Sequence, residues 1–278
     1  MTAIQIEEAA TGAVRTAPER RTRPRSSRRR SVLVSIQIAI VVAFLAAWQI
    51  GASAGWISTF LFSSPGQIVT VLAQNTGTGE LWTDLGVTAQ EVLIGFVIGA
   101  LGGSLLGLLL WYSRFVADLS APFITAIGSI PVLAVAPMMI IWFGTGLVSK
   151  VVIVAFSCVI VSLTNAYRGA QKVDTDLLDL MRSFGSSKTQ AFTKAIVPGA
   201  MSWVIAGLKL NVGFAIIGAV VGEFISSSAG VGHMIVTGSS SFAMNQVLAG
   251  VVVVMAMVLV FGLLIDLLER ILLRWDHR

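Results

Sequence analysis

The chain has 278 residues, of which 55% are hydrophobic and only 12% are charged. Soluble globular domains carry about 25% charged residues, so this composition excludes that class and indicates an integral membrane protein. The net charge is +5, but eight arginines lie between residues 15 and 30, directly before the first apolar stretch. That placement is typical of a membrane-flanking anchor and not of a nucleic-acid-binding surface.

Residues that carry enzyme chemistry are sparse and scattered. Cys158 has no second cysteine to pair with, and His233 and His277 lack a cysteine or carboxylate at metal-ligand spacing. The sequence contains no Ser/His/Asp or Cys/His set and no phosphate loop of the form G-x-x-x-x-G-K-[ST]. We therefore expect no enzyme active site and no cofactor bound by this chain.

Residues 1–30 are rich in Arg, Pro, Ser and Thr and poor in large apolar residues, which predicts a disordered basic tail. A cleaved signal peptide also begins with a basic region. The following apolar stretch, 32–50, is long enough to span a membrane, and no convincing small-x-small cleavage site follows it. The sequence therefore favours an uncleaved first helix.

Apolar stretches long enough to cross a bilayer, which takes about 20 residues, recur along the chain. They lie near 31–52, 87–111, 121–143, 147–165, 202–222 and 246–268. Polar loops with turn signals are expected at 53–86, where a short amphipathic stretch covers 68–72, and at 223–245. The predicted fold is an all-α integral membrane bundle of about six transmembrane helices. It occupies residues 31–278, with a core at 80–270.

Lysine and arginine placement predicts the orientation of this bundle. Seventeen of the nineteen basic residues lie in the N-terminal tail, the 112–120 loop, the 166–201 loop and the C-terminal end. The loops at 53–86 and 223–245 contain none. Basic residues accumulate in cytoplasmic segments. We expect a multi-pass plasma-membrane protein with both termini and the 166–201 loop in the cytoplasm.

A glycine recurs every four residues in the second span, at Gly95, Gly99, Gly103 and Gly107. Such a stripe lets another helix backbone approach closely. The partner helix can belong to the same subunit or to a second one, and we favour packing within one subunit. Neither arrangement identifies a transported solute.

The third apolar stretch contains Pro131 and Pro137, with Met138 directly after the second proline. Each proline removes a backbone donor, and broken helices in membranes are tolerated beside protein or a water-filled cavity. These residues are candidates for the lining of a translocation path, although prolines also occur in purely structural spans.

Two charged residues lie in or beside the fifth span. Lys209 is close enough to the cytoplasmic end to extend its ammonium to that surface, which we favour over a substrate role. Glu223 ends the span on the outer side and is a second path candidate, with plain contact to water as the alternative.

The polar loop at 171–201 predicts two short helices joined by a turn. Asp174, Thr175 or Asp176 can cap the first helix, and Gly185 can take the left-handed conformation of the turn. The second helix either ends at Pro198 or leads into the next helix there. A stiff, partly apolar pair of this kind suits insertion into a groove on a cytoplasmic partner.

At these residues the chain resembles the permease subunits of binding-protein-dependent ABC importers. Their hallmark is Glu-Ala-Ala, three residues, Gly, nine residues, Ile, one residue, Leu-Pro. Asp179, Gly185 and Pro198 take the acidic, glycine and proline positions, while Leu180 and Met181 replace the two alanines.

The resemblance extends over roughly residues 60–275 and favours one branch of the family. The stretches SIPVLAVAPMMIIWFGTGLVSK, NAYRGAQKVDTDLL and VVGEFISSSAGVGHMI are similar to aliphatic sulfonate, taurine and nitrate permeases. That branch also includes importers of thiamine-precursor pyrimidines.

The resemblance implies a division of labour. Two permease copies, most simply a homodimer, enclose the path; an extracytoplasmic binding protein delivers a small solute, with anions favoured; and a pair of ATPase subunits uses ATP. It further implies that the loop docks in a cleft of the ATPase. The expected coupling residues are Asp179, Arg182, Ser183, Phe184, Gly185, Lys188 and Pro198. Phe184 is either an apolar anchor for the ATPase or packs on its own second helix.

Two other classes of protein compete with this assignment. An ion-gradient-driven secondary transporter would place coupling acids near midplane, often in repeated halves, and the sequence shows neither clearly. A membrane-embedded enzyme would need clustered His, Asp or Glu residues. The importer permease is therefore the favoured hypothesis, with its solute unspecified.

Overall fold

The computed structural model describes residues 27–272, and their side chains from residue 32. The chain divides into two compact units between Ala47 and Trp48, which we treat separately. The described part of the first unit belongs to helix α2 (Ser27–Ser53), which confirms the first predicted helix and begins within the expected tail. Residues 1–26, where the disordered tail is predicted, lie outside the described residues.

The segment predicted as a polar loop at 53–86 is largely helical. It contains α3 (Thr59–Phe62) and α4 (Pro65–Thr78). Ser64 caps α4 by accepting a hydrogen bond from the Gln67 amide at 3.3 Å, and Pro65 occupies the first turn, where no backbone donor is needed. The prediction was wrong here because α4 is too polar to resemble a span and too short to show a clear helical period.

The second span runs without interruption from Glu80 to Tyr112. It consists of α5 (Glu80–Phe96), the π-helical turn η1 (Val97–Leu101), α6 (Gly102–Leu109) and the 3₁₀ turn η2 (Leu110–Tyr112). Its glycine stripe packs on α9 (Leu147–Gln171) of the same chain. A Cβ at Gly103, for example, would lie 2.2 Å from the Val159 carbonyl oxygen. The favoured interpretation, packing within one subunit, is confirmed.

The third apolar stretch is a pair of helices with a break between them, and the pair can count as one bent span. α7 (Arg114–Gly128) and α8 (Val132–Phe143) meet at an angle of 92°. Pro131 is the N-cap residue of α8, where its fixed backbone angle and missing N–H suit a helix start. Pro137 lies inside α8 without ending it.

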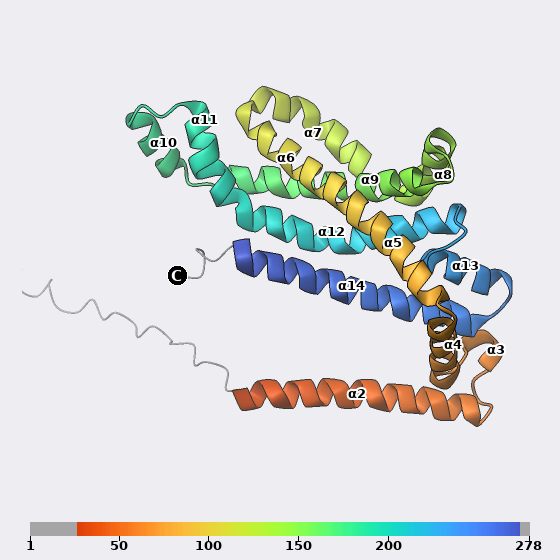
Figure 1. Cartoon of the computed structure of the whole chain (residues 1–278). Coiled ribbons are helices and arrows are strands. Elements are labelled where there is room, and N and C mark those ends of the chain that lie inside the picture. Colours follow the sequence, from red (N-terminus) through yellow and green to blue (C-terminus); the bar gives the residue numbers. More distant parts are fainter. Residues whose placement is uncertain (1–26, 273–278) are drawn as a thin grey trace, which may run out of the picture. The chain divides into compact units, whose positions relative to one another are not determined.

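The centre of the second unit is built around α9. This helix makes its largest contact with α12 (Val197–Ile225) and its next largest with α6. The buried core beside it includes Cys158, Ala215 and Ile216. Figure 1 shows α9 and α12 side by side, with α14 (Met244–Leu272) along the far side of α12.

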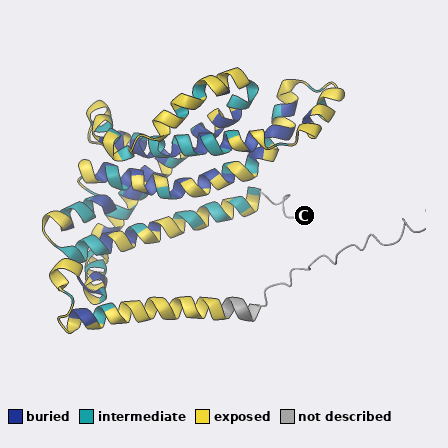
Figure 2. Cartoon of the chain, turned by 180° about the vertical axis from the view of Figure 1, so that it is seen from behind, coloured by how far each residue is buried: buried dark blue, intermediate teal, exposed yellow. Residues whose placement is uncertain are grey.

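The predicted loop at 223–245 contains another helix, α13 (Val231–Ser240), which packs on α14. By length and composition, five helical segments of the described residues can cross a membrane, or six if the bent pair α7–α8 counts as one span. In Figure 2 much of α14 is exposed, and the α5–α6 run also carries exposed apolar side chains on its outward face. Leu105, Leu259 and Leu263 are among the exposed apolar side chains of these faces, as lipid contact requires.

The polar loop forms α10 (Thr175–Ser183) and α11 (Lys188–Ala191), followed by the π-helical turn η3 (Phe192–Ile196) that leads into α12. Figure 1 shows α10 and α11 projecting beyond the long helices at the end of the second unit where α14 finishes. α3, α4 and α13 lie at the opposite end.

Candidate functional site

The first arm of the loop is closed at both ends by its own residues. The Asp174 carboxylate caps α10 by accepting a hydrogen bond from the Asp176 amide at 2.9 Å. After α10, Gly185 has a φ of 75°, in the left-handed region that glycine takes without strain. The Gly185 amide donates to the Arg182 carbonyl at 2.9 Å, and the Ser186 amide donates to the Met181 carbonyl at 3.0 Å. The predicted sharp turn is confirmed.

The second arm begins with a capping box. Ser187 and Gln190 exchange side-chain and backbone hydrogen bonds, so that two free amides of α11 are satisfied. A buried apolar cluster lies beneath the two arms and joins them to α9 and the start of α12. It includes Leu108, Ala166, Ala170, Leu178, Ala191, Ala195, Ile196 and Ala200. The loop is therefore a packed structural unit and not a flexible connector.

Pro198 does not end the second arm. It lies in the first turn of α12, in a helical run that continues from Lys188 to Ile225. The π-helical turn η3 lies directly before α12 and gives the wider hydrogen-bond spacing at the point where proline removes a donor. Of the two alternatives in the sequence, Pro198 as the start of the next helix is correct.

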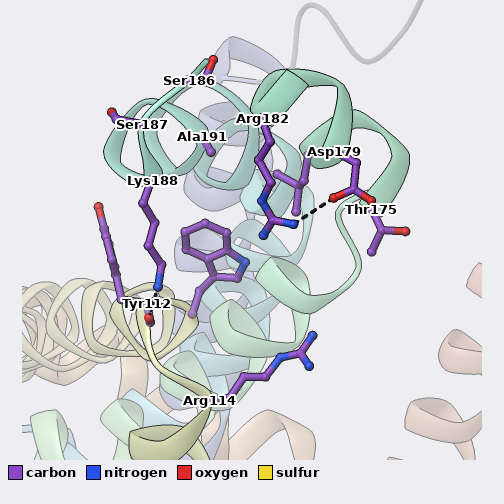
Figure 3. Close-up of a pocket in the computed structure, with 11 residues that line it drawn as sticks. Tyr112, Arg114, Thr175, Asp179, Arg182, Ser186, Ser187, Lys188 and Ala191 are labelled. Carbon is purple, nitrogen blue, oxygen red and sulfur yellow. Dashed lines mark hydrogen bonds and ion pairs between the residues drawn. The ribbon is translucent and has the colours of Figure 1, made fainter. Parts of the chain in front are cut away.

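Asp179 and Arg182 contact each other. The Arg182 guanidinium lies 2.8 Å from the Asp179 carboxylate, and both side chains are about 70% exposed (Figure 3). The Ser183 hydroxyl donates to the Asp179 carbonyl at 3.0 Å. An exposed ion pair of this kind adds little stability. Because both side chains are exposed, the pair remains accessible to a partner protein.

Phe184 stands at the tip of the loop, and the residue is 81% exposed. This exposure excludes the alternative in which it packs on its own second helix. A large aromatic side chain presented to solvent at the end of a rigid turn is suited to fill a pocket on another protein.

Lys188 points away from the tip, back toward η2. Its ammonium group donates a hydrogen bond to the Tyr112 carbonyl (Figure 3). A pocket of about 700 Å³ lies between the loop and the start of α7, and its lining includes Arg114, Arg182 and Lys188. Lys188 therefore shares this pocket with Asp179 and Arg182, but it bonds to η2 whereas those two residues pair with each other.

The four predicted path residues lie in different surroundings. Pro131 lines a cavity of about 330 Å³ at the break between α7 and α8, together with Ser129, Ser157 and Phe214. Pro137 and Met138 lie one to two turns further along α8 and are exposed. Among the cavities described here, one lies at Pro131 and the break, and the path assignment of all four residues stays a prediction.

Glu223 is buried, with 1% of its surface exposed, and it holds α13 in place. Thr88 of α5 donates to one carboxylate oxygen at 2.6 Å, and the Gly232 amide of α13 donates to the other at 2.5 Å. The Val231 amide in turn donates to the Thr88 hydroxyl at 2.9 Å. Glu223 therefore does not simply contact water, because one oxygen accepts a free amide donor at the start of α13 and the other accepts the Thr88 hydroxyl.

Sequence reasoning missed Asp84, Glu91 and Lys150 in this cluster. Asp84 accepts a hydrogen bond from the Gly230 amide at 2.7 Å. Glu91, 1% exposed, lies against Glu223, and Lys150, 4% exposed, donates to the Thr145 carbonyl at 2.7 Å. Glu91 is a buried carboxylate inside the second span, nearer its start at Glu80 than its end at Tyr112. The sequence did carry a signal, because Glu91 and Lys150 are charged residues inside apolar stretches. Burying a charge in a membrane costs free energy unless the charge has partners.

Lys209 is also engaged. Its ammonium lies 2.8 Å from Asp266 and 2.6 Å from Glu269, both in the last turns of α14. The position near the end of α14 agrees with the favoured interpretation, in which the Lys209 ammonium extends to the membrane surface and does not contact substrate. The ion pairs join α12 to α14.

Comparison with known proteins places the chain in a transport family. Residues 95–275 match the model of the binding-protein-dependent transport system inner membrane component. The aliphatic sulfonates transport permease protein SsuC of Escherichia coli K12 is 32% identical, over 84% of this chain and 89% of its own length. The taurine transport system permease protein TauC of the same strain is 26% identical, over 87% and 90%.

Solved structures agree on the fold. A chain of the inward-facing MetNI methionine ABC transporter superposes with a TM-score of 0.57 and 17% identity, over 70% of this chain and 95% of that one. A chain of an amino acid ABC transporter gives 0.56 and 20%, over 72% and 97%. None of these four relatives is named as an ion-gradient-driven transporter. The chain belongs to the family of binding-protein-dependent transport system inner membrane components, the membrane-spanning permeases of ABC importers.

Proposed function

We propose that this permease imports a small sulfonate-type anion and is driven through the α10–α11 loop by a separate ATPase. The observation that carries the coupling role is the loop itself. It is a rigid, capped pair of helices that projects from one end of the bundle with Phe184 at its tip. A projecting hairpin with an exposed aromatic tip fits a groove on a partner protein.

The remaining partners follow from the family. An extracytoplasmic binding protein delivers the solute at the end formed by α3, α4 and α13, and the loop meets the ATPase pair, which uses ATP, at the cytoplasmic end. The placement of basic residues supports this orientation, with both termini in the cytoplasm. A second permease copy completes the path, and a two-fold homodimer is the simplest closed arrangement.

The solute class rests on the names of the relatives, which transport aliphatic sulfonates and taurine. Lys150 of α9 and Lys209 of α12 are both engaged, Lys209 with carboxylates and Lys150 with a backbone carbonyl. We infer that the binding protein selects the anion and that the path does not rely on a free lysine to hold it. Uptake of labelled taurine and ethanesulfonate by the reconstituted importer tests this class, and import of neither would contradict it.

The coupling role is tested by two variants of the loop tip. Phe184→Asp replaces the exposed aromatic by a charge, and Gly185→Pro removes the amide that closes the turn and forbids its φ of 75°. Both variants are expected to insert normally, and their uptake is expected to fall at least tenfold. The reason is that an interface anchor of this type contributes about 2 kcal/mol or more to the binding free energy. ATPase co-purification and solute uptake are measured in parallel.

Lys194→Met is the matched control, since Lys194 is exposed on η3 and lies away from the tip. Normal uptake by both tip variants would refute the coupling role of the loop.

A further inference from the structure

Lys188 joins the loop to a part of the chain that is distant in sequence. Its ammonium group donates to the carbonyl of Tyr112, a residue 76 positions earlier (Figure 3). The same nitrogen lies 5.9 Å from the ring centroid of Trp111 and 5.8 Å from that of Tyr112. An ammonium at this distance is attracted by an aromatic ring, and a hydrogen bond from a charged donor is stronger than a neutral one.

Phe192, one helical turn after Lys188, reinforces the contact. Its ring centroid lies 4.7 Å from that of Tyr112 and 5.9 Å from that of Trp111. We call Lys188, Phe192, Trp111 and Tyr112 the η2 clasp. Polar and aromatic contacts act on the same two residues of η2, so the second arm of the loop and η2 are held at several points at once.

The clasp lies directly before α7, which begins at Arg114. Ser113 follows Tyr112 and caps α7, its hydroxyl accepting a hydrogen bond from the Val116 amide at 3.3 Å. Beyond this start, α7 makes far fewer contacts with α9 than α6 does, and it ends at the 92° break before α8. α7 is therefore held mainly at its loop end, and η2 fixes that end.

We propose that the η2 clasp is a positioning element that carries movement of the α10–α11 loop to α7 and, through the break, to α8. The proposal rests on the coupling function of the loop. Along the chain, the loop reaches only α9 and α12, to which it is covalently joined. The clasp adds a contact route to the broken helix pair that lines the cavity at Ser129 and Pro131. Such a contiguous network of contacts is physically able to transmit a rearrangement, and coupling measurements decide whether it does.

The first experiment compares uptake with ATP hydrolysis. The permease is reconstituted in proteoliposomes with its ATPase and binding protein. Lys188→Met keeps the apolar stem and removes both the hydrogen bond and the charge over the rings. We expect solute imported per ATP hydrolysed to fall about tenfold, the size of effect that loss of one charged hydrogen bond produces. Co-purification of the ATPase is expected to stay unchanged.

Two matched variants define the cause. Lys188→Arg is expected to restore most of the ratio, because arginine keeps both the donor and the cation over the rings. Lys194→Met removes a lysine from the same helical run, and no ion pair or ring contact of Lys194 is found in the part of the chain described. It is expected to behave as wild type.

A double-mutant cycle with Trp111→Leu supplies the coupling evidence. If Lys188 acts through the clasp, the double variant is expected to be no worse than the more severe single variant. Additive effects, a normal ratio for Lys188→Met, or loss of ATPase co-purification in that variant would each overturn the proposal. In the last case Lys188 belongs to the docking surface itself. If Lys188→Met is normal and Phe184→Asp is defective, the role proposed for the clasp is refuted, while the coupling function of the loop is supported.

Discussion

At the scale of residues, the cluster around Glu223 shows how single side chains position a helix. The start of α13 has free backbone donors, and side chains from two other helices accept them: Asp84 and Thr88 from α5, and Glu223 from α12. Gly232 permits the approach, because a Cβ there would lie 2.7 Å from a Glu223 oxygen. Asp84 and Thr88 lie 146 and 143 positions from the α13 amides that they accept, and no local pattern predicts these contacts.

Glu223→Gln tests this arrangement. Either orientation of the glutamine amide loses a hydrogen bond. If its NH₂ faces Gly232, two donors meet, and if its NH₂ faces Thr88, the Thr88 hydroxyl can no longer donate to this side chain. We expect the free energy of unfolding to fall by about 1–3 kcal/mol. Thermal unfolding of the purified permease in detergent measures the change.

Glu80→Gln is the control for this substitution, since Glu80 is exposed in the first turn of α5. An equal unfolding temperature for Glu223→Gln and Glu80→Gln would contradict the anchoring role.

At the scale of elements, the glycine stripe illustrates what a pattern predicts and where it stops. The four-residue spacing identified a helix face of close approach, and that face exists. The spacing did not identify the partner helix, because glycines at the same spacing in α12, Gly218 and Gly222, mark a second close approach. The structure shows that both approaches are to α9. The helix α13 was likewise missed, since it depends on contacts between segments and not on local hydropathy, whereas Pro131 and Pro137 did indicate a disturbed helix in the third stretch.

Gly103→Ala and Gly102→Ala form a matched pair for the stripe. A Cβ at Gly103 would lie 2.2 Å from the Val159 carbonyl oxygen, whereas a Cβ at Gly102 meets no atom within 4 Å. Overpacking a close helix contact costs about 1–3 kcal/mol, and alanine otherwise favours a helix over glycine by about 1 kcal/mol. We expect Gly103→Ala to lower the unfolding temperature and Gly102→Ala to leave it unchanged or raise it. Equal shifts would show that the stripe is not a packing surface.

At the scale of the whole molecule, topology links the two ends of the bundle. Within the second unit, the α10–α11 loop lies at one end and α13 at the other, and α12 runs between them. An importer needs such opposed ends, because solute arrives on one side of the membrane and ATP is used on the other. The proposed orientation assigns the loop to the cytoplasm.

Cysteine labelling tests the orientation. Ser183→Cys in the loop and Ser228→Cys before α13 place exposed thiols at opposite ends. A membrane-impermeant maleimide is expected to label Ser228→Cys in right-side-out vesicles and Ser183→Cys only in inverted ones. The unmodified chain is the control, because its own Cys158 is fully buried. Labelling of both variants from the same side would refute the proposed topology.

The sequence by itself determined the membrane class, the positions of the long helices, the capped loop with its turn at Gly185, and the family resemblance. All of these features depend on the composition and spacing of residues within single segments of the chain. Only the tertiary structure decided which helix meets the glycine stripe, where α7 and α8 separate, how Glu223 holds α13 and that Lys188 reaches Tyr112. These features are contacts between residues up to 135 positions apart, and their energies depend on which surfaces folding brings together.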